Sequence, residues 1–173
     1  MRLFTLIFSF ILTSCSTSNL THSTKQMEFK SRNLSFRMIV PSTWTYIKSQ
    51  GIDSFVGDIL IGRKDTLHFD FGLYSSDLDY PLWTGGFDID DSKIKTKQYV
   101  TVINGFKAKI VSHSYRNKRD FGIHFDNVST ENKERQIGDD ILEFTMYGIN
   151  ISSVGQKELR QIFQTIEFIQ CEK

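Results

Sequence analysis

The sequence lacks several features that would place it in a specialised class of protein. It has two cysteines and two prolines in 173 residues, and so few cysteines do not make a small secreted scaffold held by disulfides. Lysine and arginine number 21 against 20 aspartate and glutamate, so the strong positive charge of nucleic-acid binders is missing. The most apolar stretch, residues 3–12, is shorter than the roughly 20 residues of a membrane-spanning helix. We therefore expect one ordinary globular domain that binds no nucleic acid.

The amino-terminal residues predict export and a lipid anchor. Arg2 precedes the apolar stretch at residues 3–12, which is the arrangement of a signal peptide. The next residues, Leu-Thr-Ser-Cys at positions 12–15, resemble the lipobox of bacterial lipoproteins. This resemblance implies that Cys15 receives a lipid and that residues 1–14 are removed as the signal peptide. The alternative is a conventional signal peptide that is cut nearby, in which case Cys15 has no special role.

The segment after Cys15 is typical of a flexible tether. Residues 16–25 contain six Ser or Thr and a single leucine, which is too little apolar surface to pack against a core. We therefore expect a tether over residues 15–26 and one folded domain over residues 27–173. No acidic residue closely follows Cys15, which favours the outer membrane, on its periplasmic face. In this interpretation the lipid makes the membrane a partner of the protein.

The rest of the chain predicts short strands joined by tight turns. Residues 66–74 alternate apolar and polar side chains, as a strand with one buried face does. Asn104 and Gly105 lie between two arms rich in β-forming residues and predict a type I′ hairpin turn. Sequential short strands of this kind predict an antiparallel sheet. The expected strands cover residues 27–31, 34–40, 55–62, 66–74, 98–103, 106–114, 120–128, 140–149 and 165–169.

One helix is expected near the carboxyl end. Ser153 is the expected N-cap, and Gln156 lies where a capping box has Glu or Gln. Apolar residues then recur at helical spacing, so the helix has one face that must be buried. The predicted fold class is therefore α+β, an antiparallel β-sheet with a C-terminal amphipathic helix packed on it. The residues of the apolar face are Leu159, Ile162, Phe163 and Ile166.

Three segments resemble the PsbP-like fold family, which includes bacterial lipoproteins of the DcrB type. They are FRMIVPSTW at residues 36–44, INGFKAKI at residues 103–110, and the strand, helix and strand pattern of residues 142–168. The resemblance implies an antiparallel sheet covered by helices, and a role in binding or assembly without catalysis. The chain departs from the family in having an aspartate-rich loop where many members have a helix.

Two His-Phe-Asp tripeptides suggest a candidate metal site. His68 and Asp70 lie on one face of an expected strand, and His124 and Asp126 lie on one face of another. If the two strands were neighbours, their imidazoles and carboxylates would converge as ligands for zinc or another divalent metal. Acid/base chemistry would use the same residues. The alternative is a polar sheet face on which histidine and aspartate hydrogen bond to each other.

The loop over residues 75–97 is the candidate partner-binding segment, because it is long, acidic and rich in aromatic residues. Its last three aspartates are also candidate calcium ligands, although the glycine and glutamate of an EF-hand are missing, and a solvated acidic loop is the alternative. Trp83 is equally a candidate lid over the core. The residues proposed for partner binding are Asp77, Asp79, Tyr80, Trp83, Phe87, Asp88, Asp90 and Asp91.

These observations favour a non-catalytic module of the cell envelope that binds a protein partner. No catalytic residue is assigned, and no cofactor is expected, because the sequence has no glycine-rich loop that would cradle a phosphate before a helix. Two alternatives stay open. One is a metal-binding or hydrolase-like domain that uses the two histidine and aspartate pairs. The other is a lipocalin-like carrier of a small hydrophobic ligand, although the Gly-x-Trp signature of that family is missing around Trp44.

Overall fold

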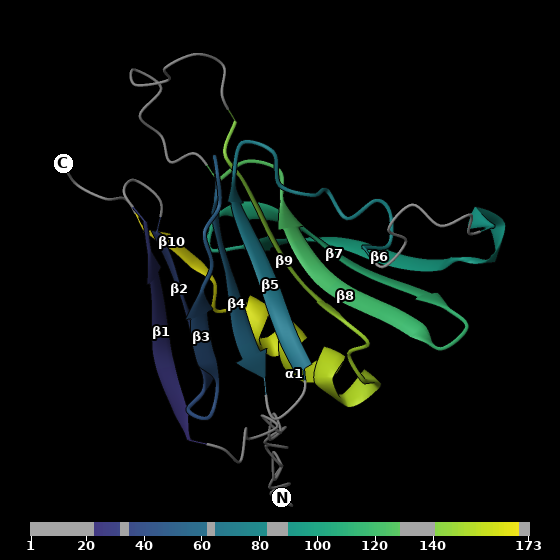
Figure 1. The fold of residues 1–173 in the computed structure, drawn as a ribbon, viewed down its shortest axis with the longest axis horizontal. Helices are drawn as coiled ribbons and strands as arrows, with labels where there is room; N and C mark the ends of the chain where they lie inside the picture. The colour runs from purple at the N-terminus through teal and green to yellow at the C-terminus, as the bar shows by residue number, and fades with distance from the viewer. Residues whose placement is uncertain (1–22, 32–34, 62–64, 83–89, 129–140, 170–173) are drawn as a thin grey trace, which may run out of the picture.

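The computed structural model describes five stretches of the chain, and these stretches contain ten β-strands, one short 3-10 helix and one α-helix. The strands form two sheets, and every pairing is antiparallel. The predicted α+β class, an antiparallel sheet with one C-terminal helix, is confirmed (Figure 1). The described residues are 23–31, 35–61, 65–82, 90–128 and 141–169.

The two sheets differ in size. Sheet A has three strands in the order β1-β2-β10, and sheet B has seven in the order β3-β4-β5-β9-β8-β7-β6. In sheet A the strands are β1 (Thr24–Lys30), β2 (Ser35–Pro41) and β10 (Glu167–Ile169). In sheet B they are β3 (Thr45–Lys48), β4 (Phe55–Ile61), β5 (Asp65–Gly72), β6 (Lys95–Ile103), β7 (Phe106–Tyr115), β8 (Lys118–Phe125) and β9 (Glu143–Ile149).

Sheet A covers one part of sheet B through aromatic side chains. Along β5, Phe69 and Phe71 are almost fully buried and alternate with polar residues, because successive side chains of a strand point to opposite faces. The ring of Phe36 on β2 lies 5.1 Å from the ring of Phe69 and 4.7 Å from that of Phe144 on β9. These edge-on ring contacts fix the two sheets face to face.

Helix α1 (Ser153–Phe163) covers another part of the same face. Phe163 stacks on Phe121 of β8 with ring centroids 5.7 Å apart, and Arg160 lies over that Phe121 ring at 4.9 Å. The N-cap is Ser152, whose hydroxyl accepts a hydrogen bond from the Gly155 amide at 3.1 Å. The expected cap Ser153 is therefore wrong by one residue, because Ser153 is already the first residue of the helix.

The predicted hairpin turn is confirmed. Asn104 and Gly105 have φ of 48° and 90°, as a type I′ turn requires. Ile103 pairs directly with Phe106, so the loop between β6 and β7 has only those two residues. The Asn104 side chain also donates to the backbone oxygen of Ile166 at 2.7 Å, which joins this hairpin to the segment after the helix.

Some boundaries differ from the expected ones. β1 begins at Thr24, inside the range 15–26 expected for the tether, because Thr24 pairs with Pro41 at the far end of β2. The short strand β3 was not expected. The end of the loop expected over residues 75–97 is instead occupied by a 3-10 helix η1 (Asp91–Lys93) and the start of β6.

Two further predictions concern the lipid anchor and the lipocalin-like alternative. Cys15 lies outside the described residues, so its lipidation stays a prediction. None of the helices in the described ranges is long and apolar enough to cross a membrane.

A lipocalin-like carrier needs a sheet that closes on itself. Sheet B, as far as its described strands show, is open, with β3 and β6 at its two edges.

Candidate functional site

The two histidine and aspartate pairs lie on the same face of sheet B, the one turned away from the core, which we call the outer face. Strand β9 lies between their strands: Asp70 pairs with Thr145, and Thr145 pairs in turn with His124. Two strand spacings separate β5 from β8, which is about 10 Å.

The condition for a shared metal site, that the two strands be neighbours, is therefore not met. Within the ranges that the structure describes, no three His, Cys, Asp or Glu side chains are grouped closely enough to hold a metal ion. The structure does not bring His68, Asp70, His124 and Asp126 together, because the strand order inserts β9 between the two pairs.

His68 has a partner that the sequence did not suggest. Its Nδ1 lies 2.6 Å from the Asp58 carboxylate on β4, because Asp58 and His68 are directly opposite each other in the antiparallel register. Ser49 donates to the other oxygen of Asp58 at 3.3 Å. The sequence held no clear signal for this pair, because Asp58 shares its face of the strand with Val56 and Leu60 and its partner follows only from the register.

His124 is buried, with 2% of its side chain exposed. Its two ring nitrogens lie 2.8 Å from the Thr145 hydroxyl and 3.1 Å from the Asp126 carboxylate. Burial lowers the pKa of His124 below its usual value, and the charge of Asp126 acts in the opposite direction. Asp126 is half exposed and also lies 3.6 Å from Lys107. The alternative interpretation, histidine hydrogen bonded to aspartate on a polar face, describes this pair.

The loop of residues 73–82, which we call the β5 loop, is fastened to the outer face. Leu78 is 3% exposed and takes a left-handed backbone conformation with φ of 60°. His113 of β7 donates from Nε2 to the Leu78 backbone oxygen at 2.9 Å. The Thr145 hydroxyl on β9 is within hydrogen-bonding distance of the Ser76 backbone oxygen. Two strands of sheet B therefore hold the middle of the loop.

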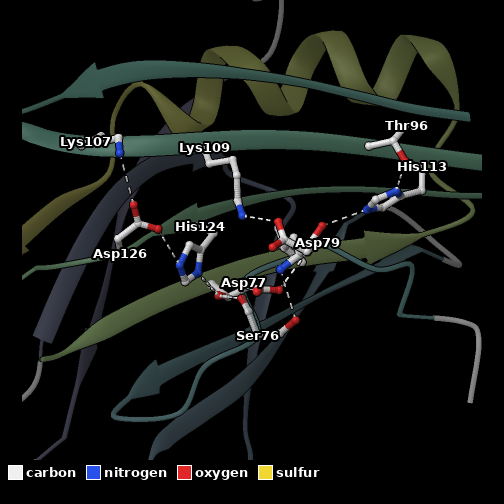
Figure 2. A network of polar contacts seen from close by, with 11 residues as sticks. Ser76, Asp77, Asp79, Thr96, Lys107, Lys109, His113, His124 and Asp126 are labelled. Atoms are coloured by element: carbon white, nitrogen blue, oxygen red, sulfur yellow. Dashed lines mark hydrogen bonds and ion pairs between the residues drawn. The ribbon is translucent and has the colours of Figure 1, made fainter.

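Both acidic and basic side chains secure the rest of the β5 loop (Figure 2). Lys109 and Asp79 form an ion pair at 2.7 Å, which lowers the pKa of Asp79 through the hydrogen bond and the positive charge. The buried carboxylate of Asp120 accepts from the Leu82 amide at 3.2 Å and from the His113 amide at 3.0 Å. Burial raises the pKa of Asp120 despite these hydrogen bonds.

A glycine on β8 leaves space for the loop. A Cβ atom on Gly122 would lie 2.8 Å from the Leu78 side chain and 2.8 Å from the Met146 backbone oxygen. Real Cβ atoms do not approach other atoms so closely, and the Met146 backbone cannot move aside as a side chain can, so Leu78 packs in space that glycine leaves open.

The residues proposed for partner binding have different positions. Tyr80 is 69% exposed, and Tyr74, which was not among the residues predicted from the sequence, is 81% exposed, so both rings project from the β5 loop. Asp90 caps η1 and pairs with Lys93 at 2.9 Å, which holds the pKa of Asp90 below its usual value. Asp77 and Asp91 are exposed as well. The other three residues, Trp83, Phe87 and Asp88, lie outside the described part of the chain.

A pocket of about 270 Å³ opens on the outer face next to the β5 loop. Ser76 and Leu82 of that loop line it, together with residues of β4, β5 and β9. Burial raises the pKa of Asp70 above its usual value, and the nearby charge of Asp53 adds to this, while a hydrogen bond from Ser54 opposes it. The pocket residues used below are Val56, Asp58, His68, Asp70 and Tyr147.

No protein-family model and no curated protein matches this chain. The resemblance to the PsbP-like family therefore stays a prediction from three short segments. The site consists of an anchored loop beside an acidic pocket on the outer face of sheet B.

Proposed function

We propose that this chain is a lipid-anchored protein of the bacterial cell envelope whose domain binds a protein partner and carries out no reaction. The proposed anchor is Cys15, and the proposed membrane is the outer membrane at its periplasmic face. The proposed contact surface is the β5 loop with the acidic segment that follows it. The lipobox-like residues 12–15 support the anchor, and the resemblance to the PsbP-like family supports a role in binding.

The observation that carries the binding function is that exposed tyrosines project from a loop whose backbone is held in place. Tyr74 and Tyr80 are largely exposed, whereas Leu78 between them is buried and bonded to His113. Tyrosine is enriched at protein interfaces because it offers a large area with little rotamer entropy to lose. A loop that is already ordered also pays less entropy when a partner binds.

The first experiment tests the anchor. Cells that express the full chain are fed an alkyne-labelled fatty acid, and the chain is then tagged and separated by electrophoresis. We expect label in the wild type and none in Cys15→Ser. The matched control is Cys171→Ser, which removes the other cysteine and is expected to keep the label. Equal labelling of Cys15→Ser and the wild type would contradict the anchor.

The second experiment tests the contact surface in living cells. A photo-crosslinking amino acid replaces Tyr80 in one strain and Val154, a residue of α1 that is also largely exposed, in a control strain. We expect one dominant cross-linked protein from position 80, not seen from position 154. The amount of this cross-linked protein is also expected to decrease in Leu78→Ala, because that change removes the side chain that fixes the loop. Equal capture from both positions would contradict a contact through the β5 loop.

A further inference from the structure

We propose that the pocket beside the β5 loop binds the head group of an organic cation, a primary ammonium or a guanidinium. The head group would lie between the Asp58 and Asp70 side chains, with its carbon stem against the apolar part of the lining. A free amine and a Lys or Arg side chain of another protein share this chemistry. The inference concerns the pocket alone and does not depend on the partner proposed for the loop.

The charges around the pocket are unbalanced. Two carboxylates, Asp58 and Asp70, line it, and the imidazole of His68 is hydrogen bonded to Asp58 at 2.6 Å. Asp70 has no cationic partner among the described residues, and the charge of another carboxylate, Asp53, acts on it and raises its pKa. Lys109, on the same face, is already paired with Asp79. A cation entering the pocket would therefore meet an uncompensated carboxylate.

Asp70 is also incompletely hydrogen bonded. Its Oδ1 is buried and has no hydrogen-bond partner among the described residues. A buried carboxylate oxygen in this state destabilises the folded protein. Asparagine of nearly the same shape would avoid the charge, so the presence of aspartate points to a ligand that is attracted by the negative charge of this carboxylate, without contact to the buried Oδ1.

The other walls of the pocket suit an alkyl stem that carries a cation. The rings of His68 and Tyr147 lie side by side with centroids 5.3 Å apart, and aromatic faces attract ammonium and guanidinium groups. Val56 and Leu82 provide apolar surface. A volume of about 270 Å³ is at the small end of ligand pockets, so it has room for a head group and a short chain.

An organic cation fits these residues better than a metal ion. A divalent metal needs several His, Cys, Asp or Glu ligands at short distances, and no group of three such side chains is close enough in the described ranges. An alkylammonium ion needs only one or two carboxylates, and it buries its stem on apolar atoms.

The test measures binding of small probes to the purified full chain. Backbone amide shifts of Asp58, Asp70 and Tyr147 are followed by NMR during titration with n-butylamine, n-butylguanidine and the neutral n-butanol. A second arm uses acetyl-Gly-Lys-Gly-amide and its glutamine counterpart, acetyl-Gly-Gln-Gly-amide. We expect the cations to shift these amides and the neutral probes to have little effect. Tighter binding of the lysine peptide than of butylamine would identify a protein side chain as the source of the cation. Tighter binding of butylamine would identify a free amine as the source.

Two substitutions separate charge from shape. Asp70→Asn is expected to weaken cation binding about tenfold, because it removes one charge-assisted contact. Asp126→Asn removes a carboxylate of the same face outside the pocket and is expected to leave binding within about twofold. Asp58→Asn gives the same test if Asp70→Asn does not fold. The proposal is overturned if butanol binds as well as the cations, if no probe shifts these amides, or if the folded pocket variants bind as tightly as the wild type.

Discussion

The imidazole of His113 and the backbone oxygen of Leu78 are joined by a hydrogen bond of 2.9 Å across 35 positions of the sequence. The carbonyl can only accept, so Nε2 of His113 carries the hydrogen, and Nδ1 lies 2.8 Å from the Thr96 hydroxyl of β6. This buried arrangement connects two strands of sheet B to the β5 loop. It makes the loop part of the folded structure, although Tyr74 and Tyr80 on it are exposed.

Replacing His113 should release the β5 loop. His113→Leu leaves the buried oxygen of Leu78 without a donor, which costs about 1–3 kcal/mol of unfolding free energy. We expect faster hydrogen exchange at the Leu82 amide, which the neighbouring carboxylate of Asp120 holds at 3.2 Å. His113→Gln keeps an N–H donor and is the matched control. Unchanged exchange in the leucine variant would contradict the role of His113 as an anchor.

Gly122 and Leu78 should behave as a coupled pair. Gly122→Ala places a methyl group 2.8 Å from the Leu78 side chain and 2.8 Å from the Met146 backbone oxygen, and such overpacking costs about 1–3 kcal/mol. Leu78→Ala removes one of these two clashes. In a double-mutant cycle by chemical denaturation, we expect the pair to lose less stability than the sum of the single changes. Strict additivity would mean that the two residues do not share this contact.

Stability should fall on acidification through His124. Burial lowers its folded-state pKa below the usual 6.5, so the unfolded chain binds the proton first as the pH decreases. The contribution of neutral His124 is therefore complete above about pH 6.5 and is lost progressively below that value. His124→Gln does not titrate, and we expect its unfolding free energy to fall less than that of the wild type between about pH 7 and pH 5.

The comparison for His124 is the difference between the two pH profiles, which cancels the contribution of all other titrating groups. Parallel profiles would show that the pKa of His124 is the same in the folded and unfolded states. Asp126→Asn gives a second comparison, since the Asp126 carboxylate raises the pKa of His124. This variant should show a steeper loss on acidification than the wild type.

Asp70→Asn should stabilise the free protein at neutral pH. Burial raises the pKa of Asp70 above its usual 3.8, so the folded protein holds this proton more tightly than the unfolded chain does. The favourable contribution of Asp70 to the stability of the wild type is therefore complete below about pH 3.8. It is lost as the pH rises through the raised pKa. The neutral asparagine avoids that loss.

Thermal unfolding at several pH values checks this prediction. We expect a higher melting temperature for Asp70→Asn than for the wild type at pH 7, with the difference disappearing in acid. Asp126→Asn removes an exposed, paired carboxylate and should give no such gain. A lower melting temperature for Asp70→Asn at pH 7 would show that the folded protein stabilises the charged carboxylate.

The sequence alone was sufficient for part of the local structure, although it did not predict β3, the start of β1 or the exact N-cap of α1. Alternation along 66–74 predicted the strand in which Leu67, Phe69 and Phe71 are buried, because only every second side chain of a strand points to the core. Asn104 and Gly105 predicted a type I′ turn, because this turn needs positive φ at both central residues and few residues other than Asn and Gly adopt it easily. The spacing of Leu159, Ile162 and Phe163 predicted the buried face of α1. These features depend on neighbours in the chain.

Residue partners and the order of the strands were decided only by the tertiary structure. The sequence gives the faces of two His-x-Asp strands and not the strand between them, because hydrogen bonds of a sheet join segments that are distant in the chain. The register of β4 and β5 placed Asp58 opposite His68, and the order β5-β9-β8 kept His68 apart from His124. Packing against sheet B in turn made the β5 loop an ordered structure, through Leu78, His113 and Asp120.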